Sequence, residues 1–151
     1  MEVMTIEGAA MINLTIKENF DYSSKNPKLC ALGEYKGRTF IVIYIGAHPC
    51  VYVECKTDLY KQEYEQENFP YLVHGGFTWY SPLSHWIKHF DNIDPKLLRK
   101  KYVGWDYAHF DDYTRFCDDY EQTDNLTRWT TDNIIECIID LIDWMDKNGV
   151  N

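Results

Sequence analysis

The segment RTFIVIYIG, residues 38–46, decides the fold of this chain. β-Branched and aromatic residues fill it without a polar interruption, and Gly37 and Gly46 bound it, which is typical of a strand buried in a sheet. Residues 11–18 alternate apolar with polar side chains, and residues 29–35 end just before a Lys-Gly turn. We therefore expect all three segments to be strands of one antiparallel sheet.

The clearest helix lies at the carboxyl end, in residues 130–149. Asn133 and Glu136 have the spacing of an N-cap and its reciprocal partner, and Gly149 provides a stop. The apolar residues recur at helical spacing, at Ile134, Ile135, Ile138, Leu141, Ile142 and Met145. The sequence thus predicts an α+β fold, an antiparallel-type sheet with a C-terminal amphipathic helix packed on it.

Shorter elements are expected between the sheet and the closing helix. Residues 57–67 are rich in helix formers and can be capped by either of their first two residues. Residues 71–80 read as a strand interrupted by two glycines, and residues 81–90 as a loop with a helical turn. Residues 102–108 have the composition of a strand that ends in a polar loop.

One compact domain is expected over residues 1–151, because this length is usual for a domain and no linker-like stretch interrupts it. A formal net charge of −9 disfavours direct binding of nucleic acid, which depends on Lys and Arg. Much of the charge lies in one acidic run: Asp106, Asp111, Asp112, Asp118, Asp119, Glu121 and Asp124. For its outer members a solvated face is the simpler interpretation.

The cysteines and the amino terminus indicate a cytoplasmic location. Five cysteines without a CxxC pair suggest reduced thiols rather than a disulfide framework. The first twenty residues have no basic cluster before an apolar run, so they do not resemble a secretory signal. No stretch of about twenty apolar residues could span a bilayer, and we expect no membrane association. A homo-oligomer stays open, because exposed aromatic residues serve either a partner copy or a ligand.

Polar residues follow the strand-like segment 102–108 at regular spacing. Asp106, His109 and Asp112 stand three positions apart, so a helix or tight loop would bring them together. Such a group can ligate a divalent metal, or it can hold a His oriented by a carboxylate for acid–base chemistry. The alternative, a turn capped by Asp106 with His109 as an ordinary polar residue, stays open.

A second motif, VHGGFTWY, spans residues 73–80. Its adjacent glycines permit positive φ angles and a close approach of backbone amides to a ligand. His74 beside them can act as an acid, a base or a hydrogen-bond donor, and Trp79 and Tyr80 can stack on a planar base. A β-bulge or hairpin with aromatic core residues would explain the same letters.

Three further histidines are weaker candidates. His48 follows the strongest strand and precedes a proline, so its ring is expected to project from a strand end. A solvent-facing loop residue is the competing interpretation for His48. His85 and His89 stand four apart and can pair as metal ligands across one helical turn, although an exposed amphipathic turn is favoured.

Taken in order, these motifs resemble a widespread family of uncharacterised phage and prophage proteins, over roughly residues 38–147. That family shows G-H-P, then V-H-G-G-L-T-Y/F, then G-F-D-x-A-H-x-x-D, and then a closing helix. The positions that match are His48, Pro49, His74, Gly75, Gly76, Thr78, Gly104, Asp106, Ala108, His109 and Asp112. Ala47 and Trp105 depart from the usual Gly and Phe, and Asp111 stands where a small residue is common. The resemblance implies action inside a bacterial host cytoplasm, with counter-defence as one role, and it brings no known reaction.

Three functions are consistent with these residues. The leading hypothesis is a counter-defence protein that sequesters a small nucleotide-type molecule in a pocket of His, Asp and aromatic residues. The expected pocket residues are His48, His74, Gly75, Gly76, Thr78, Trp79, Trp105, Asp106, His109 and Asp112.

The second hypothesis is a hydrolase that acts on such a molecule, and the sequence does not decide whether the protein is an enzyme. Its catalytic residues would be His74, Asp106, His109 and Asp112, and the candidate ligands of an unidentified metal would be Asp106, His109 and Asp112. The third hypothesis is an inhibitor of a host defence nuclease, in which acidic residues between 106 and 121 mimic a nucleic-acid backbone.

Overall fold

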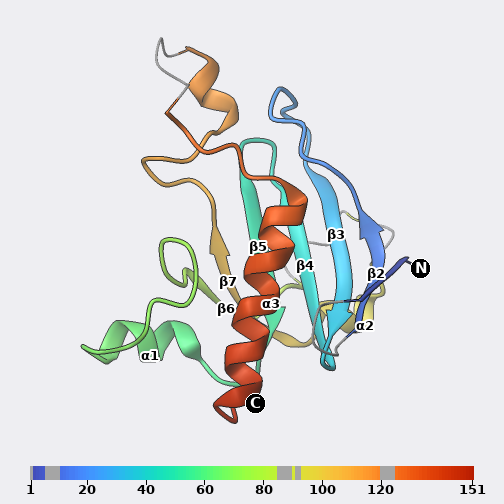
Figure 1. The fold of residues 1–151 in the computed structure, drawn as a ribbon. Coiled ribbons are helices and arrows are strands. Elements are labelled where there is room, and N and C mark those ends of the chain that lie inside the picture. The colour runs from blue at the N-terminus through green and yellow to red at the C-terminus, as the bar shows by residue number, and fades with distance from the viewer. Residues whose placement is uncertain (1, 6–10, 85–89, 91–92, 120–124) are drawn as a thin grey trace.

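The computed structural model describes residues 2–5, 11–84, 90, 93–119 and 125–151. A seven-stranded sheet forms its central layer, with the strand order β1-β2-β3-β4-β5-β7-β6 (Figure 1). Every pair of neighbouring strands is antiparallel. The strands are β1 (Glu2–Thr5), β2 (Met11–Lys17), β3 (Lys28–Tyr35), β4 (Arg38–Tyr44), β5 (Pro49–Glu54), β6 (Trp79–Pro82) and β7 (Lys101–Asp106).

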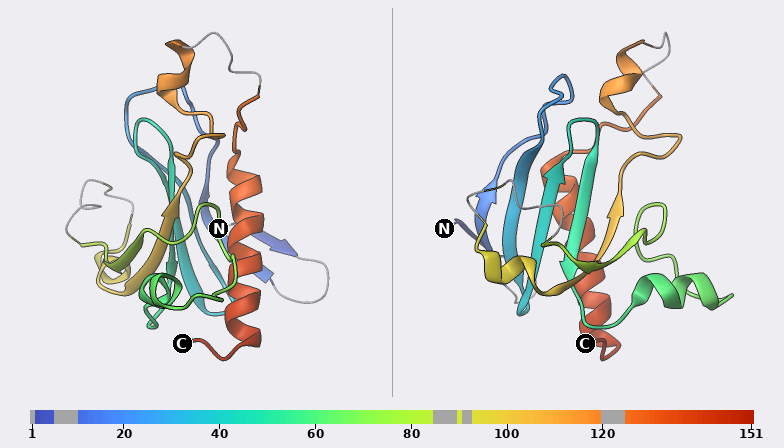
Figure 2. Two further views of the ribbon diagram at one scale, coloured as in Figure 1. Left: turned by 90° about the vertical axis from the view of Figure 1, so that its left-hand side faces the viewer. Right: turned by 180° about the vertical axis from the view of Figure 1, so that it is seen from behind.

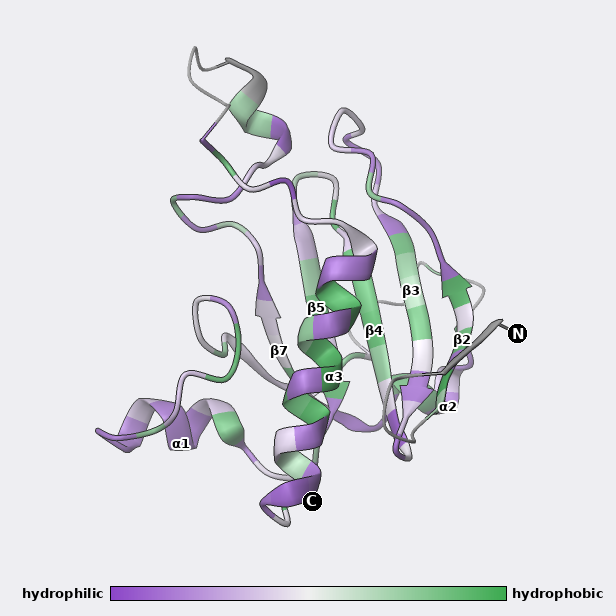
Figure 3. Cartoon of the chain, in the orientation of Figure 1, coloured by the Kyte–Doolittle hydropathy of each residue, from purple (hydrophilic) through white to green (hydrophobic). Residues whose placement is uncertain are grey.

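Strand β4 lies at the centre of the sheet, and its residues after Arg38 are all buried. Phe40 and Val42 belong to the core under the closing helix, while Ile41 and Ile43 belong to a second apolar cluster. Successive side chains of a strand point to opposite faces, so one continuous apolar run requires that both faces be covered. Figure 3 shows the hydrophobic colouring that runs along β4.

Helix α3 (Thr131–Lys147) covers one face of the sheet (Figures 1 and 2). All six apolar residues of the predicted stripe are buried there: Ile134, Ile135, Ile138, Leu141, Ile142 and Met145. The α+β fold, with an antiparallel sheet and a C-terminal helix packed on it, is therefore confirmed. The predicted cap was wrong: Thr130 caps the helix, and its side chain accepts from the backbone N–H of Asn133.

Helix α2 (Pro95–Leu98) lies on the opposite face, as the left view of Figure 2 shows. Its Leu98 joins the second cluster with residues such as Tyr52 and Tyr102. The sequence did not predict this short helix, nor the 3₁₀ helix η1 (Arg115–Asp119). Residues 81–82, expected in a loop, instead end β6. The helical turn expected within residues 81–90 falls largely on residues 85–89, which lie outside the described residues.

Helix α1 (Leu59–Glu65) forms where a helix was expected, and Asp58 caps it by accepting from the N–H of Lys61. The strand expected over residues 71–80 was mostly wrong. Only its end forms a strand, and the preceding residues form a loop in which Gly75 and Gly76 both have positive φ.

The structure also bears on two expectations about the whole chain. All five cysteines are free thiols, as the sequence suggested. Within the ranges that the structure describes, no helix combines the length and the apolar character needed to cross a bilayer.

Candidate functional site

Two loops next to the paired strands β6 and β7 carry the candidate site. These strands run antiparallel, with Trp79 opposite Gly104, so the loop before β6 and the loop after β7 lie at the same end of the pair. The first loop contains His74 and the second contains His109 and Asp112. Residues more than thirty positions apart in the chain thereby meet in one cluster.

Asp112 organises this cluster from a buried position, with 2% of its surface exposed. Its Oδ2 lies 2.8 Å from His74 Nε2 and accepts from the backbone N–H of His109 at 2.8 Å. Its Oδ1 accepts from Trp129 Nε1 at 2.9 Å. A buried carboxylate is stable only when such donors satisfy it, so the three contacts fix both the carboxylate and its neighbours.

Aromatic rings fix the orientation of His74. Its imidazole stacks on Tyr107, with ring centroids 4.9 Å apart and an interplanar angle of 6°. Trp129 packs against the same imidazole at 5.1 Å, and His109 meets it edge-on at 5.0 Å. Burial raises the pKa of Tyr107, so its hydroxyl stays neutral and accepts a hydrogen bond from Trp105 Nε1. The ring of His74 is thus held on several sides while a quarter of its side chain stays exposed.

His109 lies against the loop that contains Gly75 and Gly76, which is called the glycine loop below. Its Nε2 is shielded from solvent and makes no hydrogen bond to any residue that the structure describes. Asp106 Oδ1 is 3.5 Å away, too far for a well-formed bond. A Cβ atom built on Gly75 would lie 2.0 Å from this nitrogen. Gly75 is therefore required here for space as well as for its φ of +72°.

The cluster has the donor set of a metal site and the geometry of an acid–base pair. His74, His109 and Asp112 each offer one ligand atom, and these atoms lie within 4.8 Å of one another. Two imidazoles and a carboxylate suit a divalent transition metal. This group differs from the predicted ligand set in one member: it contains His74, from the other loop, and not Asp106, which lies beside His109.

The expected aromatic binding residues lie elsewhere. Trp105 is 1% exposed and packs on Phe77 in the core under α3, so the expectation that it stacks on a ligand was wrong. Trp79 packs with Tyr52 against the cluster on the opposite face of the sheet, away from His74. Strand alternation explains both positions, because each side chain follows the face that its register assigns to it.

The remaining predicted residues have other contacts or lie outside the described part of the chain. His48 contacts Pro49 and Cys50 at the start of β5, and it is not part of the His74 cluster. Thr78 is exposed and its backbone N–H pairs with Gly104. Gly76 lies against the Glu63 carboxylate of α1. His85 and His89, named as a weaker pair of metal ligands, lie outside the described residues.

Two residues of the site were missed by the sequence reasoning. Trp129 holds the carboxylate of Asp112, and Tyr107 stacks on His74. Trp129 stands between an acidic run and a helix cap, and no local pattern there marks it as a partner of Asp112. Tyr107 had a signal, since it lies inside the motif that contains Asp106 and His109.

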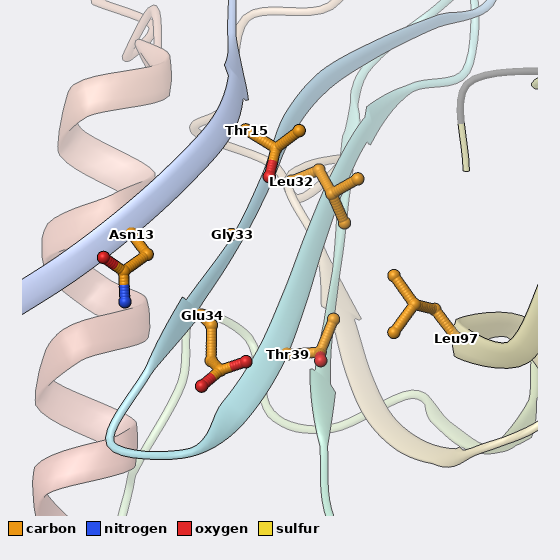
Figure 4. A pocket seen from close by; sticks show the side chains of 7 residues that line it. All are labelled: Asn13, Thr15, Leu32, Gly33, Glu34, Thr39 and Leu97. Atoms are coloured by element: carbon orange, nitrogen blue, oxygen red, sulfur yellow. The ribbon is translucent and has the colours of Figure 1, made fainter. Parts of the chain in front are cut away.

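A separate cavity opens on the sheet face away from α3, with a volume of about 320 Å³ (Figure 4). Its lining is Asn13, Thr15, Leu32, Gly33, Glu34, Thr39 and Leu97. None of the residues predicted to bind a ligand lines it, so this cavity is not the expected pocket of His and aromatic residues.

Comparison of this chain with protein-family models, with curated proteins and with solved structures finds no significant match.

Proposed function

We propose that this protein hydrolyses a small nucleotide-type molecule at the cluster of His74, His109 and Asp112, as a phage-type counter-defence protein in a bacterial cytoplasm. The observation that supports the reaction is the 2.8 Å contact between His74 and the buried, fully hydrogen-bonded Asp112. A carboxylate held in this way fixes the position of its histidine, as sites that activate water require. The substrate class and the cellular role rest on the resemblance of the motifs to phage proteins.

Hydrolysis fits this site better than sequestration, the leading hypothesis from the sequence. Storage of a ligand needs an enclosing pocket and rings that are free to stack on it. Trp105 is in the core, and the large rings exposed near the cluster are Tyr71 and Phe110, which are 76% and 94% exposed. Tyr71 hydrogen-bonds to the Gly75 N–H through its hydroxyl, and Phe110 follows His109 in the chain. Rings as exposed as these do not enclose a bound molecule, so they do not provide the sealed pocket that storage needs.

The acidic-inhibitor hypothesis gains less support. Asp112 is buried and shares its charge with neighbouring donors, so it cannot act as a surface mimic of a phosphate. The side chains of Asp118 and Asp119 and all of Glu121 lie outside what the structure describes. Asp112 therefore serves the cluster instead of a charged surface, whereas Asp111 beside it is exposed.

The test is incubation of the purified protein with a panel of nucleotide signals, cyclic oligonucleotides and ADP-ribose derivatives among them, followed by mass spectrometry of the small molecules. We expect a hydrolysed product from the wild type and less than about a tenth of it from His74→Ala, since general acid–base groups contribute at least that much. Asp140→Asn, an exposed carboxylate on α3, is the control that should retain activity.

Each outcome separates the hypotheses. A molecule that is retained and released unchanged would replace hydrolysis with sequestration. A protein that neither binds nor converts any member of the panel would contradict both, and equal activity of His74→Ala and wild type would remove the cluster from the reaction.

A further inference from the structure

We infer that His74, His109 and Asp112 bind a divalent transition-metal ion of the zinc class. Binding of the ion is argued from the donor atoms alone, while the role that we give it in water activation rests on the proposed function. Catalytic zinc sites commonly use three protein ligands of this kind and keep a further position open for water or substrate.

The spacing of the donors fits one ion after a small adjustment. Ligand atoms that share a tetrahedral zinc at ~2.0–2.1 Å lie about 3.4 Å from one another. The donor atoms of the three residues lie within 4.8 Å of one another. Both histidines are partly exposed members of loops, with 25% and 37% of their side chains accessible. Because both rings are carried by loops, a small shift of the loops toward each other can close the remaining gap without a change in the sheet.

The unpaired nitrogen of His109 is the second observation that indicates an ion. Buried polar atoms are nearly always hydrogen-bonded, and one that is not needs a physical explanation. Nε2 of His109 is shielded from solvent and has no bonding partner in the described part of the chain. Gly75 packs directly on this nitrogen and keeps the ring close to His74. A metal bond would satisfy the nitrogen that protein groups leave unpaired.

Asp112 can become a ligand without losing its place. Its bonds from Trp129 and from the His109 backbone do not involve the side chain of His74. They hold the carboxylate while His74 exchanges its contact with Asp112 for one with the ion. A proton carried between His74 and Asp112 leaves to solvent, because a nitrogen that ligates a metal carries none. Trp129 then acts as an outer partner that orients a metal ligand.

The ion also removes an electrostatic difficulty of the proposed function. A chain with a net charge of −9 and carboxylates at the site repels a phosphate-bearing substrate. A divalent ion held by one carboxylate and two neutral imidazoles keeps a net positive charge, so it can take a phosphate oxygen and lower the pKa of a bound water. In that state His74 and Asp112 serve as ligands, and the bound water is the nucleophile.

The experiment measures metal binding directly on protein freed of metal by dialysis against a chelator. Titration with Zn²⁺ against a chromophoric chelator gives the affinity, and titration with Co²⁺ gives a visible absorption that reports coordination by the protein. We expect one ion per chain. Loss of the His109 ligand in His109→Ala should raise the Kd on the order of 100-fold, at least as much as the loss of a residue that only orients a ligand. Circular dichroism checks that each variant is folded.

Matched controls make the result specific to the cluster. The double variant His85→Ala/His89→Ala removes the other candidate histidine pair and should keep the wild-type affinity. His74→Ala should weaken binding as His109→Ala does. Absence of stoichiometric binding, or an affinity that depends on His85 and His89 and not on His109, would overturn the inference.

The outcomes for the ion and for the reaction are distinguishable. Tight binding of the ion with no turnover of any nucleotide would support the metal site and contradict the proposed hydrolysis. Turnover that persists in protein shown to be free of metal would support the hydrolysis and overturn the metal inference.

Discussion

Nε2 of His74 lies 2.8 Å from Oδ2 of Asp112, although 38 positions separate the two residues in the chain. The antiparallel pairing of β6 with β7 produces this contact, because it sets the loop before one strand beside the loop after the other. Trp129, from the segment leading into α3, completes the arrangement on Oδ1. Three parts of the chain therefore depend on one buried carboxylate.

Asp112→Asn should destabilise the protein by about 3 kcal/mol. The backbone N–H of His109 and the indole N–H of Trp129 bond to different oxygens of Asp112. An amide has only one oxygen, so its NH₂ group must face one of these donors in either orientation. Denaturant unfolding monitored by circular dichroism measures the loss.

Asp140→Asn is the matched control, since it makes the same chemical change on the exposed face of α3. It should change the free energy of unfolding by less than about 0.5 kcal/mol. If Asp112→Asn is equally mild, the buried hydrogen-bond arrangement is not a major source of stability.

The sequence predicted the fold well because the deciding signals are local. The continuous apolar run predicts β4 from seven neighbouring residues, and the helical spacing of apolar residues predicts α3 from a single segment. The sequence predicts a strand around Gly75, because the aromatic and β-branched neighbours favour one. The positive φ angles of Gly75 and Gly76 form a loop there instead.

The site was only partly predictable for a different reason. The motifs identified His74, His109 and Asp112, but the contact of Trp129 with Asp112 depends on how α3 docks on the sheet. The strand segment alone did not show whether Trp105 is buried. Alternation places its side chain on the opposite face of the sheet from those of the residues before and after it, but it does not say which face is covered. Tertiary packing decides which face is buried.

Thr130→Ala should destabilise α3 by about 1 kcal/mol, the usual loss for an N-cap. The Thr130 hydroxyl oxygen accepts from the N–H of Asn133 and also donates to the Asn133 side chain. Asn133→Ala keeps the capping bond and removes only the second contact, so its effect should be smaller. A larger loss in Asn133→Ala, measured by thermal unfolding of both variants, would restore the cap expected from the sequence.

The buried cysteines should resist alkylation in the folded protein. Burial raises the pKa of Cys30 to about 11, and burial with the nearby charge of Asp106 raises that of Cys50 to about 12. The reactive species is the thiolate, and a pKa about two units above the ordinary 9.0 lowers its fraction at pH 8 roughly a hundredfold. Iodoacetamide at pH 8 should modify the partly exposed Cys117 first, as read by peptide mass spectrometry.

Unfolding supplies the control for this labelling. In denaturant all five cysteines should react at similar rates, because none is held in a disulfide. Rapid modification of Cys50 in the native protein would mean that the start of β5 opens readily at this end of the sheet.

Gly75→Ala tests the contact between the glycine loop and His109. Gly75 and Gly37 both have positive φ, at +72° and +79°, so an alanine at either position has a similar backbone cost of about 1–2 kcal/mol. A Cβ at Gly75 would also lie 2.0 Å from His109 Nε2, whereas a Cβ at Gly37 meets nothing within 4 Å. We therefore expect Gly75→Ala to lose more stability than Gly37→Ala in denaturant unfolding, and to displace His109 from His74.

Zn²⁺ affinity should fall in Gly75→Ala and stay unchanged in Gly37→Ala. Equal stabilities and equal affinities for the two variants would show that His109 does not occupy the position against Gly75 on which the metal site depends.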